Sequence, residues 1–566
     1  MSNPHSRLLA AAALSGLGAA ALAQQALPPQ IPQVTPRDLR PEIAPKPPAN
    51  VPQAAAETPP ANADRLFVSI DAIVIDDAFP ELAAKTEALL PAYTRHRIAA
   101  SKFYALAGAI EALYRSAGYP LVRVTVPPQA LKDGGTLHLA VLDGFIESVD
   151  VKGVAEAARD PVRKTLQPLV GRRRLTSSAL ERALTLAGRI PGVALRSALG
   201  PGKEPGAAVL VLEGEQQAFS GSISGDNRLT GSLGPWEETF QVRLNQPFGR
   251  REQEYAYASS GPDLTEAPSS NRAKRLVFGG GVILPLNFDG LQLNPEYTWS
   301  DTKPRTPAGG LRTEAKFERY TLRLIEPLIL EHAQELTLTG TLDATNQTNT
   351  APDFDFTFTL DRLRVGRLGL DWSGAFASGH LHAWGTGSRG FAGLGARTRA
   401  DEAASFVGFS RPAMTPTFTK LELGLTLEQP LPLEAQSTLT LRGQIAKGVL
   451  PSSEEFSVDG EDALSLYTSG AISDDEGATA REELTRAFGT DLGSKTITLA
   501  PYLFGAIGKT RTKLPPAAFP GSEASYGVGL HVACNTLSLG AEYGRHTAHG
   551  GTPDGAQFFF KAQVQF

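Results

Sequence analysis

The chain has 566 residues, a formal net charge of −5 at neutral pH and a single cysteine, Cys534. The length is enough for several domains, the charge and the lack of a long basic run argue against nucleic acid as the main partner, and one cysteine excludes an internal disulfide. The 56 glycines, 12 tyrosines and 26 phenylalanines, against two methionines, favour many strands separated by turns.

The first residues are typical of a secretory signal peptide. Arg7 supplies the positive charge, residues 8–20 form an apolar run, and Ala21-Leu22-Ala23 fits the small-x-small cleavage pattern. The run is too short to span a bilayer as a helix, which takes about 20 apolar residues. We predict a signal peptide over residues 1–23. A linker without a helix is predicted over residues 24–62, which are rich in Pro, Ala and Gln.

A change in the pattern of apolar residues marks a first α+β domain, predicted over residues 63–144. Apolar residues recur at helical spacing from Leu106 to Tyr114 and stop before Gly118, as expected of a helix C-terminus. Three alternating segments predict strands over residues 66–75, 119–126 and 136–142.

A second domain with the same logic is predicted over residues 145–215, joined to the first without a linker. Leu180, Leu184 and Ala187 share one face of a predicted helix over residues 177–190. Its strands are predicted over residues 145–151, 193–197 and 207–212.

From residue 216 to 566 the pattern is strand and turn alone. No window of about 18 apolar residues follows the leader, so a chain that enters a membrane must do so as a closed barrel. A barrel of 16 antiparallel strands would leave about 22 residues per strand and connection, and counts of 14 or 18 fit nearly as well. The fold class predicted is therefore α+β domains followed by an all-β transmembrane barrel.

The last strand carries the strongest signal for a membrane barrel. Alternate residues from Phe558 to Phe566 are apolar, and those between them, apart from Phe559, are polar. A soluble sandwich would alternate in the same way, but this chain ends on the aromatic residue itself. A terminal Phe of this kind resembles the signal by which barrels are recognised for assembly into the outer membrane. We therefore assign that role to Phe566.

Several blocks of the chain resemble one family, the two-partner secretion transporters of the Omp85 superfamily, which export hemolysins and adhesins. The blocks are Gly118-Tyr119, Leu121-Val122-Arg123-Val124, Pro127-Pro128-Gln129, Asp143-Gly144-Phe145-Ile146, Gly225-Asp226-Asn227-Arg228 and Asn245-Gln246-Pro247-Phe248-Gly249. In that family, a signal peptide precedes two POTRA domains and a 16-stranded barrel. The resemblance makes both α+β domains POTRA domains and suggests Tyr119, Arg123 and Gln129 as client-binding residues.

The most specific block runs from Arg442 through Ser453-Glu454-Glu455-Phe456 to Gly477. In the family, such a block leads to Val-Arg-Gly-Tyr on a long loop that folds back into the barrel, and its Arg pairs with the Asp of a Phe-x-Asp-x-Gly motif on a later strand. An alignment without gaps places the loop motif on Leu464, Ser465, Leu466 and Tyr467, with Gly470 and Gly477 in step. The wall motif falls on Phe504, Ala506 and Gly508.

Both charged partners of the family motifs are therefore replaced, the Arg by Ser465 and the Asp by Ala506. Removing one member of a buried pair strands the other charge, at roughly 3–5 kcal/mol, whereas replacing both is often nearly neutral. The joint loss thus supports the alignment. It leaves two possibilities for the loop: anchoring through Tyr467, or no firm anchor.

The resemblance implies a pore in the outer membrane of a Gram-negative bacterium, with its POTRA domains in the periplasm, and no enzyme activity or cofactor. POTRA domains would capture an unfolded secreted partner by adding its strand to an exposed edge. Folding of that client outside would draw it through the pore without nucleotide hydrolysis. The other expected partners are outer-membrane lipids and the barrel-assembly machinery. The alternative is a diffusion channel or a membrane-protein assembly factor.

Matches to enzyme and metal motifs are weak. Residues 385–390 fit G-x-G-x-x-G but lack the strand-turn-helix context, which favours a glycine-rich loop. The pairs His380/His382 and His546/His549 lack nearby carboxylate or cysteine partners and are interpreted as loop histidines, so no metal site is predicted. The acidic run 474–476 lacks EF-hand spacing, and the basic run 172–174 is interpreted as a solvated turn rather than a surface for an acidic client.

Overall fold

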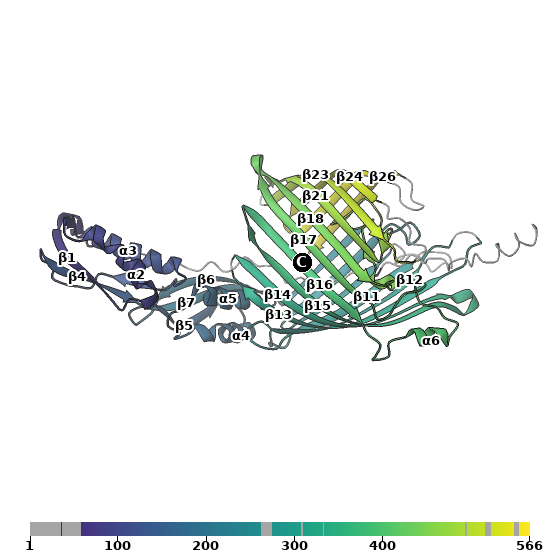
Figure 1. The fold of residues 1–566 in the computed structure, drawn as a ribbon, viewed down its shortest axis with the longest axis horizontal. Helices are drawn as coiled ribbons and strands as arrows, with labels where there is room; N and C mark the ends of the chain where they lie inside the picture. Colours follow the sequence, from purple (N-terminus) through teal and green to yellow (C-terminus); the bar gives the residue numbers. More distant parts are fainter. Residues whose placement is uncertain are drawn as a thin grey trace, which may run out of the picture.

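The computed structural model describes residues 35–36, 58–261, 274–306, 309–331, 333–492, 495–514, 522–547 and 554–566. It shows two small α+β units in line with a large β-barrel (Figure 1). The signal peptide predicted over residues 1–23 lies outside the described residues, as does most of the predicted linker.

The first α+β unit is a four-stranded sheet in the order β2-β1-β4-β3 covered by helices. Its elements are β1 (Phe67–Asp76), α2 (Ala83–Glu87), β2 (Arg97–Ala99), α3 (Ser101–Ser116), β3 (Arg123–Thr125) and β4 (Gly135–Leu142). The apolar stripe of α3 is buried, and Gly118, with a φ of 92°, ends the helix as predicted. The predicted strand over residues 119–126 is confirmed only in its second half, since Pro120 lies in a turn and can donate no hydrogen bond.

The second unit is a three-stranded sheet in the order β5-β7-β6 with two helices. Its elements are β5 (Phe145–Lys152), α4 (Glu156–Leu166), α5 (Ser177–Gly188), β6 (Val193–Pro201) and β7 (Ala207–Gln216). The predicted helix and strands are confirmed. The sequence reading missed α4, which contains Pro161, a residue that usually breaks a helix. No helix in the described part of the chain is long and apolar enough to cross a membrane.

The barrel consists of sixteen antiparallel strands within the described residues, which confirms the predicted fold class. Two strand segments, β21 and β22, both pair with β23 and together make one strand. The segments are β8 (Phe219–Asp226), β9 (Glu237–Asn245), β10 (Gln253–Ser260), β11 (Lys274–Pro285), β12 (Gln292–Lys303), β13 (Glu314–Leu330), β14 (Gln334–Ala351), β15 (Phe356–Phe376), β16 (Gly379–Gly390), β17 (Thr419–Leu431), β18 (Ala435–Lys447), β21 (Glu476–Arg486), β22 (Phe488–Leu492), β23 (Lys495–Arg511), β24 (Ser522–Cys534), β25 (Leu537–His546) and β26 (Gly555–Gln565).

The barrel closes where its last strand meets its first. Lys561 to Gln565 of β26 pair with Asp226 to Ser222 of β8. The terminal Phe566 adds one more rung, because its N–H donates to the Gly221 carbonyl at 3.0 Å and its carbonyl accepts from the Gly221 N–H at 2.8 Å. The final residue of the chain therefore contributes its backbone to closure, while its ring stays on the outer face beside Phe219.

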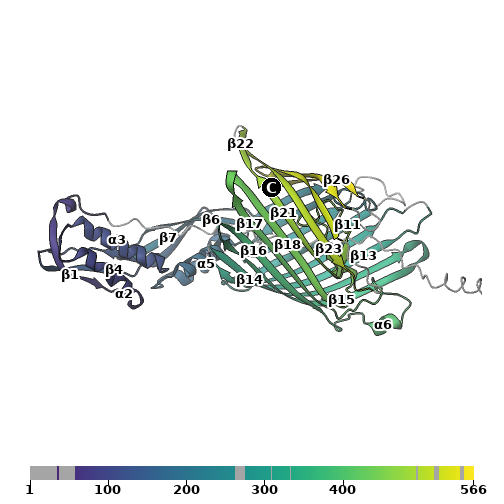
Figure 2. The same cartoon turned by 45° about the horizontal axis from the view of Figure 1, so that its top comes forward.

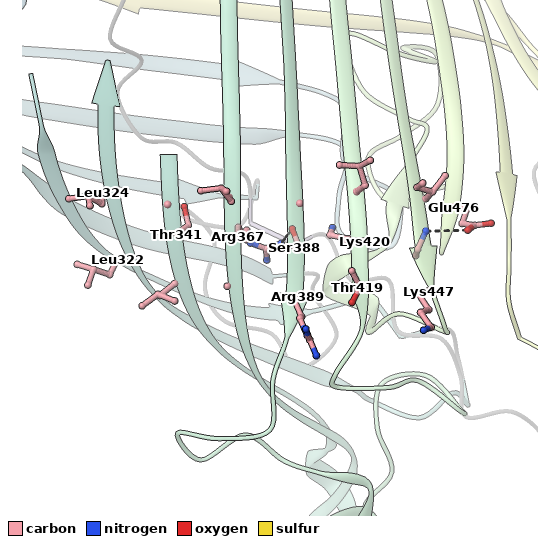
Figure 3. A pocket seen from close by; sticks show the side chains of 18 of the residues that line it. Leu322, Leu324, Thr341, Arg367, Ser388, Arg389, Thr419, Lys420, Lys447 and Glu476 are labelled. Carbon is pink, nitrogen blue, oxygen red and sulfur yellow. Dashed lines mark hydrogen bonds between the residues drawn. The ribbon is translucent and has the colours of Figure 1, made fainter. Parts of the chain in front are cut away.

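The barrel wall has an apolar outer face and a polar inner face, as the alternation along its strands predicts. On β13, Leu322 and Leu324 are exposed on the outside (Figure 3), whereas Thr321 and Arg323 are buried inside. Leucine is favourable where lipid tails wet the wall, and polar side chains satisfy one another in the lumen. This pattern is what the closed barrel requires of a membrane-spanning sheet.

The second α+β unit docks on the barrel end that carries the short β13–β14 turn (Figures 1 and 2), called here the near end. Arg182 of α5 donates from Nε to Asp289 Oδ1 at 2.8 Å, and Ser178 donates to Glu331 Oε1 at 2.8 Å. Arg189, at the C-terminus of the same helix, forms an ion pair with Glu335. These contacts fix the second unit at the near end of the barrel.

The basic run 172–174 lies in an exposed turn, as predicted, and this turn is at the joint between the two α+β units, where two of its residues make contacts. The Arg173 guanidinium stacks 3.9 Å above the Phe145 ring. Arg174 pairs with Glu81 of the first unit at 3.4 Å, and its backbone N–H donates to Asp143. The run therefore helps to fix one unit against the other.

Candidate functional site

The connection between β18 and β21, residues 448–475, folds back into the lumen and is called here the lumen loop. Its two legs pair through the short strands β19 (Phe456–Ser457) and β20 (Ser473–Asp474). The buried Asp459 carboxylate joins the legs, because it accepts from the N–H groups of Gly470 at 2.8 Å and Ile472 at 3.3 Å. The loop is therefore a folded element with its own internal hydrogen bonds.

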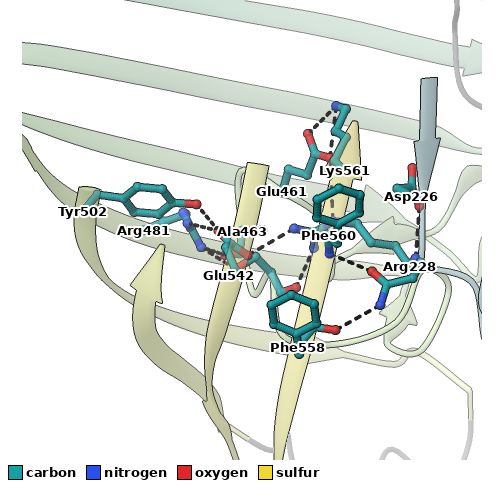
Figure 4. Close-up of polar contacts among 12 residues, drawn as sticks. Asp226, Arg228, Glu461, Ala463, Arg481, Tyr502, Glu542, Phe558, Phe560 and Lys561 are labelled. Carbon is teal, nitrogen blue, oxygen red and sulfur yellow. Dashed lines mark hydrogen bonds and ion pairs between the residues drawn. The ribbon is translucent and has the colours of Figure 1, made fainter. Parts of the chain in front are cut away.

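The tip of the lumen loop is held by two arginines of the barrel wall. Arg228, in the β8–β9 connection, donates to the Ser465 carbonyl at 2.6 Å, and Arg481 of β21 donates to the Ser465 hydroxyl at 2.6 Å. Glu542 of β25 lies between them and accepts from Arg228 at 3.1 Å and from Arg481 at 2.7 Å (Figure 4). Since all four side chains are buried, each charge has a partner where water is scarce.

Two further ionic contacts surround this network. Glu461 of the loop lies 3.6 Å from Arg228 and accepts from Lys561 of β26 at 3.0 Å (Figure 4). The wall thus supplies the cations at the tip, and the loop supplies Glu461 and the groups of Ser465.

Apolar contacts complete the seat of the tip. Leu464 and Tyr467 cluster with Ala506, and Leu466 clusters with Phe504 and Phe559. A β-carbon added at Gly508 would lie 2.6 Å from Leu464 Cδ1, so only glycine leaves room for that side chain. The Tyr467 hydroxyl also donates to the Thr547 carbonyl at 2.5 Å.

The residues aligned with the family's two motifs are therefore brought together in space. Leu464, Ser465, Leu466 and Tyr467 form the buried tip, and Phe504, Ala506 and Gly508 form the wall against which it packs. Of the two glycines in step, Gly470 donates its N–H to Asp459, and Gly477 packs against the ring of Phe456.

The anchor of the tip was not predicted from the sequence. Arg481 is the direct cross-strand neighbour of Ala506, the position of the family Asp. The arginine that holds the tip therefore lies on the barrel wall, whereas the family motif has its arginine on the loop. Tyr467 contributes to the anchor, which was the first of the two possibilities. The ionic contacts come from Arg228, Arg481 and Glu542, and no motif in the sequence pointed to these residues.

The base of the lumen loop is held by a second set of charges. Glu454 is buried and pairs with Arg367 at 2.6 Å and with Lys420 at 3.1 Å. Burial by itself would raise the pKa of Glu454, but Arg367 and Lys420 lower it to about 2. Asp475, at the other end of the loop, accepts from Arg411 at 2.5 Å. Both legs of the loop are thus held by ion pairs where they leave the barrel wall.

A vestibule opens at the near end of the barrel, between the second α+β unit and the lumen. It is a cavity of about 840 Å³ lined on one side by residues of the second unit and on the other by the barrel, including Arg189, Pro191, Arg251, Asp371, His382 and Glu428. Its lining mixes charged and polar side chains with apolar ones such as Ile190 and Phe288. The lumen loop lies inside the barrel beyond it, in contact with the inner wall.

A described piece of the predicted linker also lies in the lumen. Thr35 and Pro36 line a cavity of about 20 Å³ together with Ser300, Phe317 and Gln347 of the inner wall. Pro36 is buried there. This segment therefore adds to the obstruction of the pore.

The three candidate client-binding residues are engaged within the first α+β unit. The Tyr119 hydroxyl donates to Glu81 at 2.9 Å, and Arg123 pairs with the buried Glu111 at 3.1 Å. The Gln129 amide exchanges two hydrogen bonds with the backbone of His138, donating to its carbonyl at 2.7 Å and accepting from its N–H at 2.9 Å. Gln129 therefore occupies part of β4 that the short strand β3 leaves unpaired.

Two interpretations of short motifs need correction. Residues 385–390 lie in strand β16, not in a loop, because they pair with β15 on one side and, up to Arg389, with β17 on the other. His380 and His382 lie in the same strand, and His382 has a carboxylate partner, Asp371, at 2.9 Å. His546 lies in β25, and His549 is outside the described residues. Within those residues no group of three metal-binding side chains is found.

The chain is similar to known proteins over most of its length. A sequence profile described as "Haemolysin secretion/activation protein ShlB/FhaC/HecB" matches residues 206–532, and one for the "POTRA domain, ShlB-type" matches residues 69–144. The "Outer membrane transporter CdiB" of Escherichia coli is 21% identical over 420 residues, 74% of this chain and 68% of the relative.

Solved structures share the fold. CdiB from Escherichia coli superposes with a TM-score of 0.70 at 19% identity, covering 91% of this chain and 94% of that chain. CdiB from Acinetobacter baumannii superposes with a TM-score of 0.60 at 14% identity, covering 99% and 98%. These likenesses extend over both α+β units and the barrel.

Proposed function

Because the chain belongs to the family of haemolysin secretion/activation proteins ShlB/FhaC/HecB, we propose that it exports a specific secreted partner protein through its barrel. It is an outer-membrane transporter of the two-partner secretion type, and its POTRA domain lies in the periplasm. The near end of the barrel is thus the periplasmic end. The second α+β unit would be a second POTRA domain, and the partner would be a haemolysin-like or adhesin-like protein.

Capture of the partner would begin at a strand edge. In the second unit, β6 lies at the edge of its sheet and pairs only with β7 among the described strands. An extended client can add a strand to such an edge through main-chain hydrogen bonds. The same unit lines the vestibule, so a client bound there would lie at the mouth of the pore. We place the first contact on β6 in preference to the first unit, where Gln129 covers part of β4 that β3 leaves unpaired.

Passage would require the lumen loop to leave its seat. The polar anchoring of the loop tip is the observation that supports the proposal most. The tip rests on hydrogen bonds and ion pairs to Arg228, Arg481 and Lys561, contacts that can be exchanged for water or for the client. No nucleotide would be needed if the client folds outside the cell and cannot return.

The test combines gene deletion with site-specific cross-linking. Deletion should remove one large protein from the culture medium or cell surface, and expression of this chain should restore it. A photoreactive residue at the exposed Ala198 of β6 should then cross-link to that protein, whereas one at the exposed Arg163 of α4 should not. If no protein is lost and the purified barrel conducts small solutes freely, the proposal fails in favour of a diffusion channel. If assembly of other barrels is impaired instead, an assembly factor is favoured.

A further inference from the structure

The outer face of the barrel carries a hollow that the transport of a protein does not use. Its volume is about 1180 Å³, and it lies across β14 to β18 with β13 at its margin (Figure 3). Its walls are leucines and an isoleucine that alternate with glycines along one row of paired residues. That row runs Leu324, Gly340, Leu368, Gly387, Leu421 and Ile445.

The floor of the hollow is made by three glycines. An added β-carbon would meet nothing within 4 Å at Gly340 and Gly387, and at Gly366 only Leu342 Cδ2 at 3.9 Å. None of the three has a left-handed backbone conformation that would demand glycine. The absence of side chains here therefore leaves open space on a lipid-wetted wall, of a shape that acyl chains can fill.

Two cations stand at one end of the hollow. Arg389 and Lys447 lie in the same row of paired residues, with Thr419 between them, so their backbones are about 10 Å apart at two strand spacings. Both side chains are exposed, and neither forms an ion pair with another of the described residues. The nearby Glu476 is already neutralised by Lys513 at 2.7 Å. The end of the hollow is therefore positively charged.

The position of these two cations along their strands indicates which leaflet of the membrane the hollow faces. Arg389 and Lys447 are at the strand ends that lead into the long β16–β17 connection and the lumen loop, opposite to the periplasmic POTRA domain. That end faces the cell exterior. Charged side chains on the lipid face are tolerated at the interface, where they contact headgroups. A basic site beside an apolar hollow is typical of a bound anionic lipid.

We propose that this hollow is a binding site for a phosphorylated glycolipid of the outer leaflet, of the lipid A class. Its acyl chains would lie over Gly340, Gly366 and Gly387, and a phosphate would bind Arg389 and Lys447. Arg367 and Lys420, the two cations at the base of the lumen loop, point inward and alternate with the lipid-facing residues along β15 and β17. A lipid bound in the hollow would therefore contact the same part of the wall that holds the base of the loop.

The test measures lipid binding to the purified full-length protein in detergent by native mass spectrometry, with lipid A and phosphatidylethanolamine as probes. Wild type should bind lipid A saturably and more tightly than phosphatidylethanolamine. Arg389→Ala with Lys447→Ala should weaken lipid A binding about 30-fold, as two cations near a membrane surface imply. Gly340→Leu with Gly387→Leu should weaken it without any change of charge.

Matched controls lie on another part of the wall. Lys509→Ala with Arg545→Ala removes two exposed cations from β23 and β25, and Gly505→Leu fills open space on β23. Both should leave lipid A binding unchanged. A gel shift on boiling shows that each variant still forms a barrel. Equal binding of both lipids, equal loss in the controls, or a dimer that occupies the hollow in place of lipid would overturn the proposal.

Discussion

The guanidinium of Arg481 donates to the hydroxyl of Ser465 at 2.6 Å and joins the barrel wall to the tip of the lumen loop. The two residues belong to β21 and to the loop that precedes it, and both are buried. A hydrogen bond that involves an ionised group contributes about 1.5–3 kcal/mol. This contact is therefore strong enough to influence whether the loop stays in the lumen.

Arg481→Ala should loosen the loop tip and open the pore more often. The variant removes the contacts to Ser465 and Glu542, while Arg228 still pairs with Glu542 and prevents a stranded charge. Conductance in planar bilayers should rise, with longer open periods than in wild type. Lys509→Ala, on the outer face of β23, serves as control. Unchanged conductance in Arg481→Ala would show that the tip does not limit the pore.

Glu542→Gln should be more damaging than Arg481→Ala. Glu542 pairs with Arg228 at 3.1 Å and with Arg481 at 2.7 Å, so its neutralisation leaves two buried cations close together. Loss of one partner from a buried ion network costs about 3–5 kcal/mol. The midpoint of denaturant-induced unfolding, followed by the gel shift on boiling, should fall markedly. A midpoint equal to that of wild type would contradict this account of the network.

Gly508→Val tests the apolar seat of the tip. The added β-carbon would lie 2.6 Å from Leu464 Cδ1, so the tip must move away. Overpacking of this kind costs about 1–3 kcal/mol. Gly505→Val, three residues earlier on the same strand, is the matched control, since its β-carbon meets nothing within 4 Å. Protease cleavage of the lumen loop should increase in Gly508→Val alone, and equal cleavage in both variants would contradict the packing model.

Much of the fold follows from local pattern. Alternation along strands such as β13 and β26 predicts a wall with one apolar face, and chain length limits the strand number to a few values. The helical spacing in α3 and α5 is equally local. The helix α4 was missed because Pro161 outweighs its other residues in any local reading.

The site is less predictable because its partners are distant in the chain. An alignment located Ser465 and Ala506, since they occupy motif positions on two separate segments. Arg228 and Ser465, however, are 237 residues apart, and Arg481 and Glu542 are 61 apart. Their contact depends on the barrel register, which brings β8, β21 and β25 around one loop. No local spacing in the sequence carries that information.

The joint between the two α+β units should loosen in acid. Hydrogen bonds from its own backbone and from the Tyr119 hydroxyl hold the pKa of Glu81 below its ordinary value of 4.5. The folded state therefore favours the carboxylate that pairs with Arg174, and this contribution is present above about pH 4.5 and lost as the pH falls through the lowered pKa.

Distances between spin labels on the two units should therefore broaden in acid in wild type. Glu81→Gln should broaden them already at neutral pH, with Cys534→Ser as the common background. A distribution that is independent of pH and equal in both proteins would mean that this pair does not fix the joint.

Introducing a pair of opposite charges at the tip provides the most specific test of the anchor. Ala506 lies opposite Arg481 in the β21–β23 pair, so the carboxylate of Ala506→Asp would be within reach of Arg481 and would draw it away from Ser465. Ser465→Arg would add a third cation beside Arg228 and Arg481, which already share Glu542. Each single variant should therefore loosen the loop, and Ser465→Arg should also lower stability. The double variant should recover most of the lost stability, because the new charges pair with each other. The interaction energy from a double-mutant cycle on the denaturation midpoints checks this, and additive effects would show that positions 465 and 506 do not meet across the lumen.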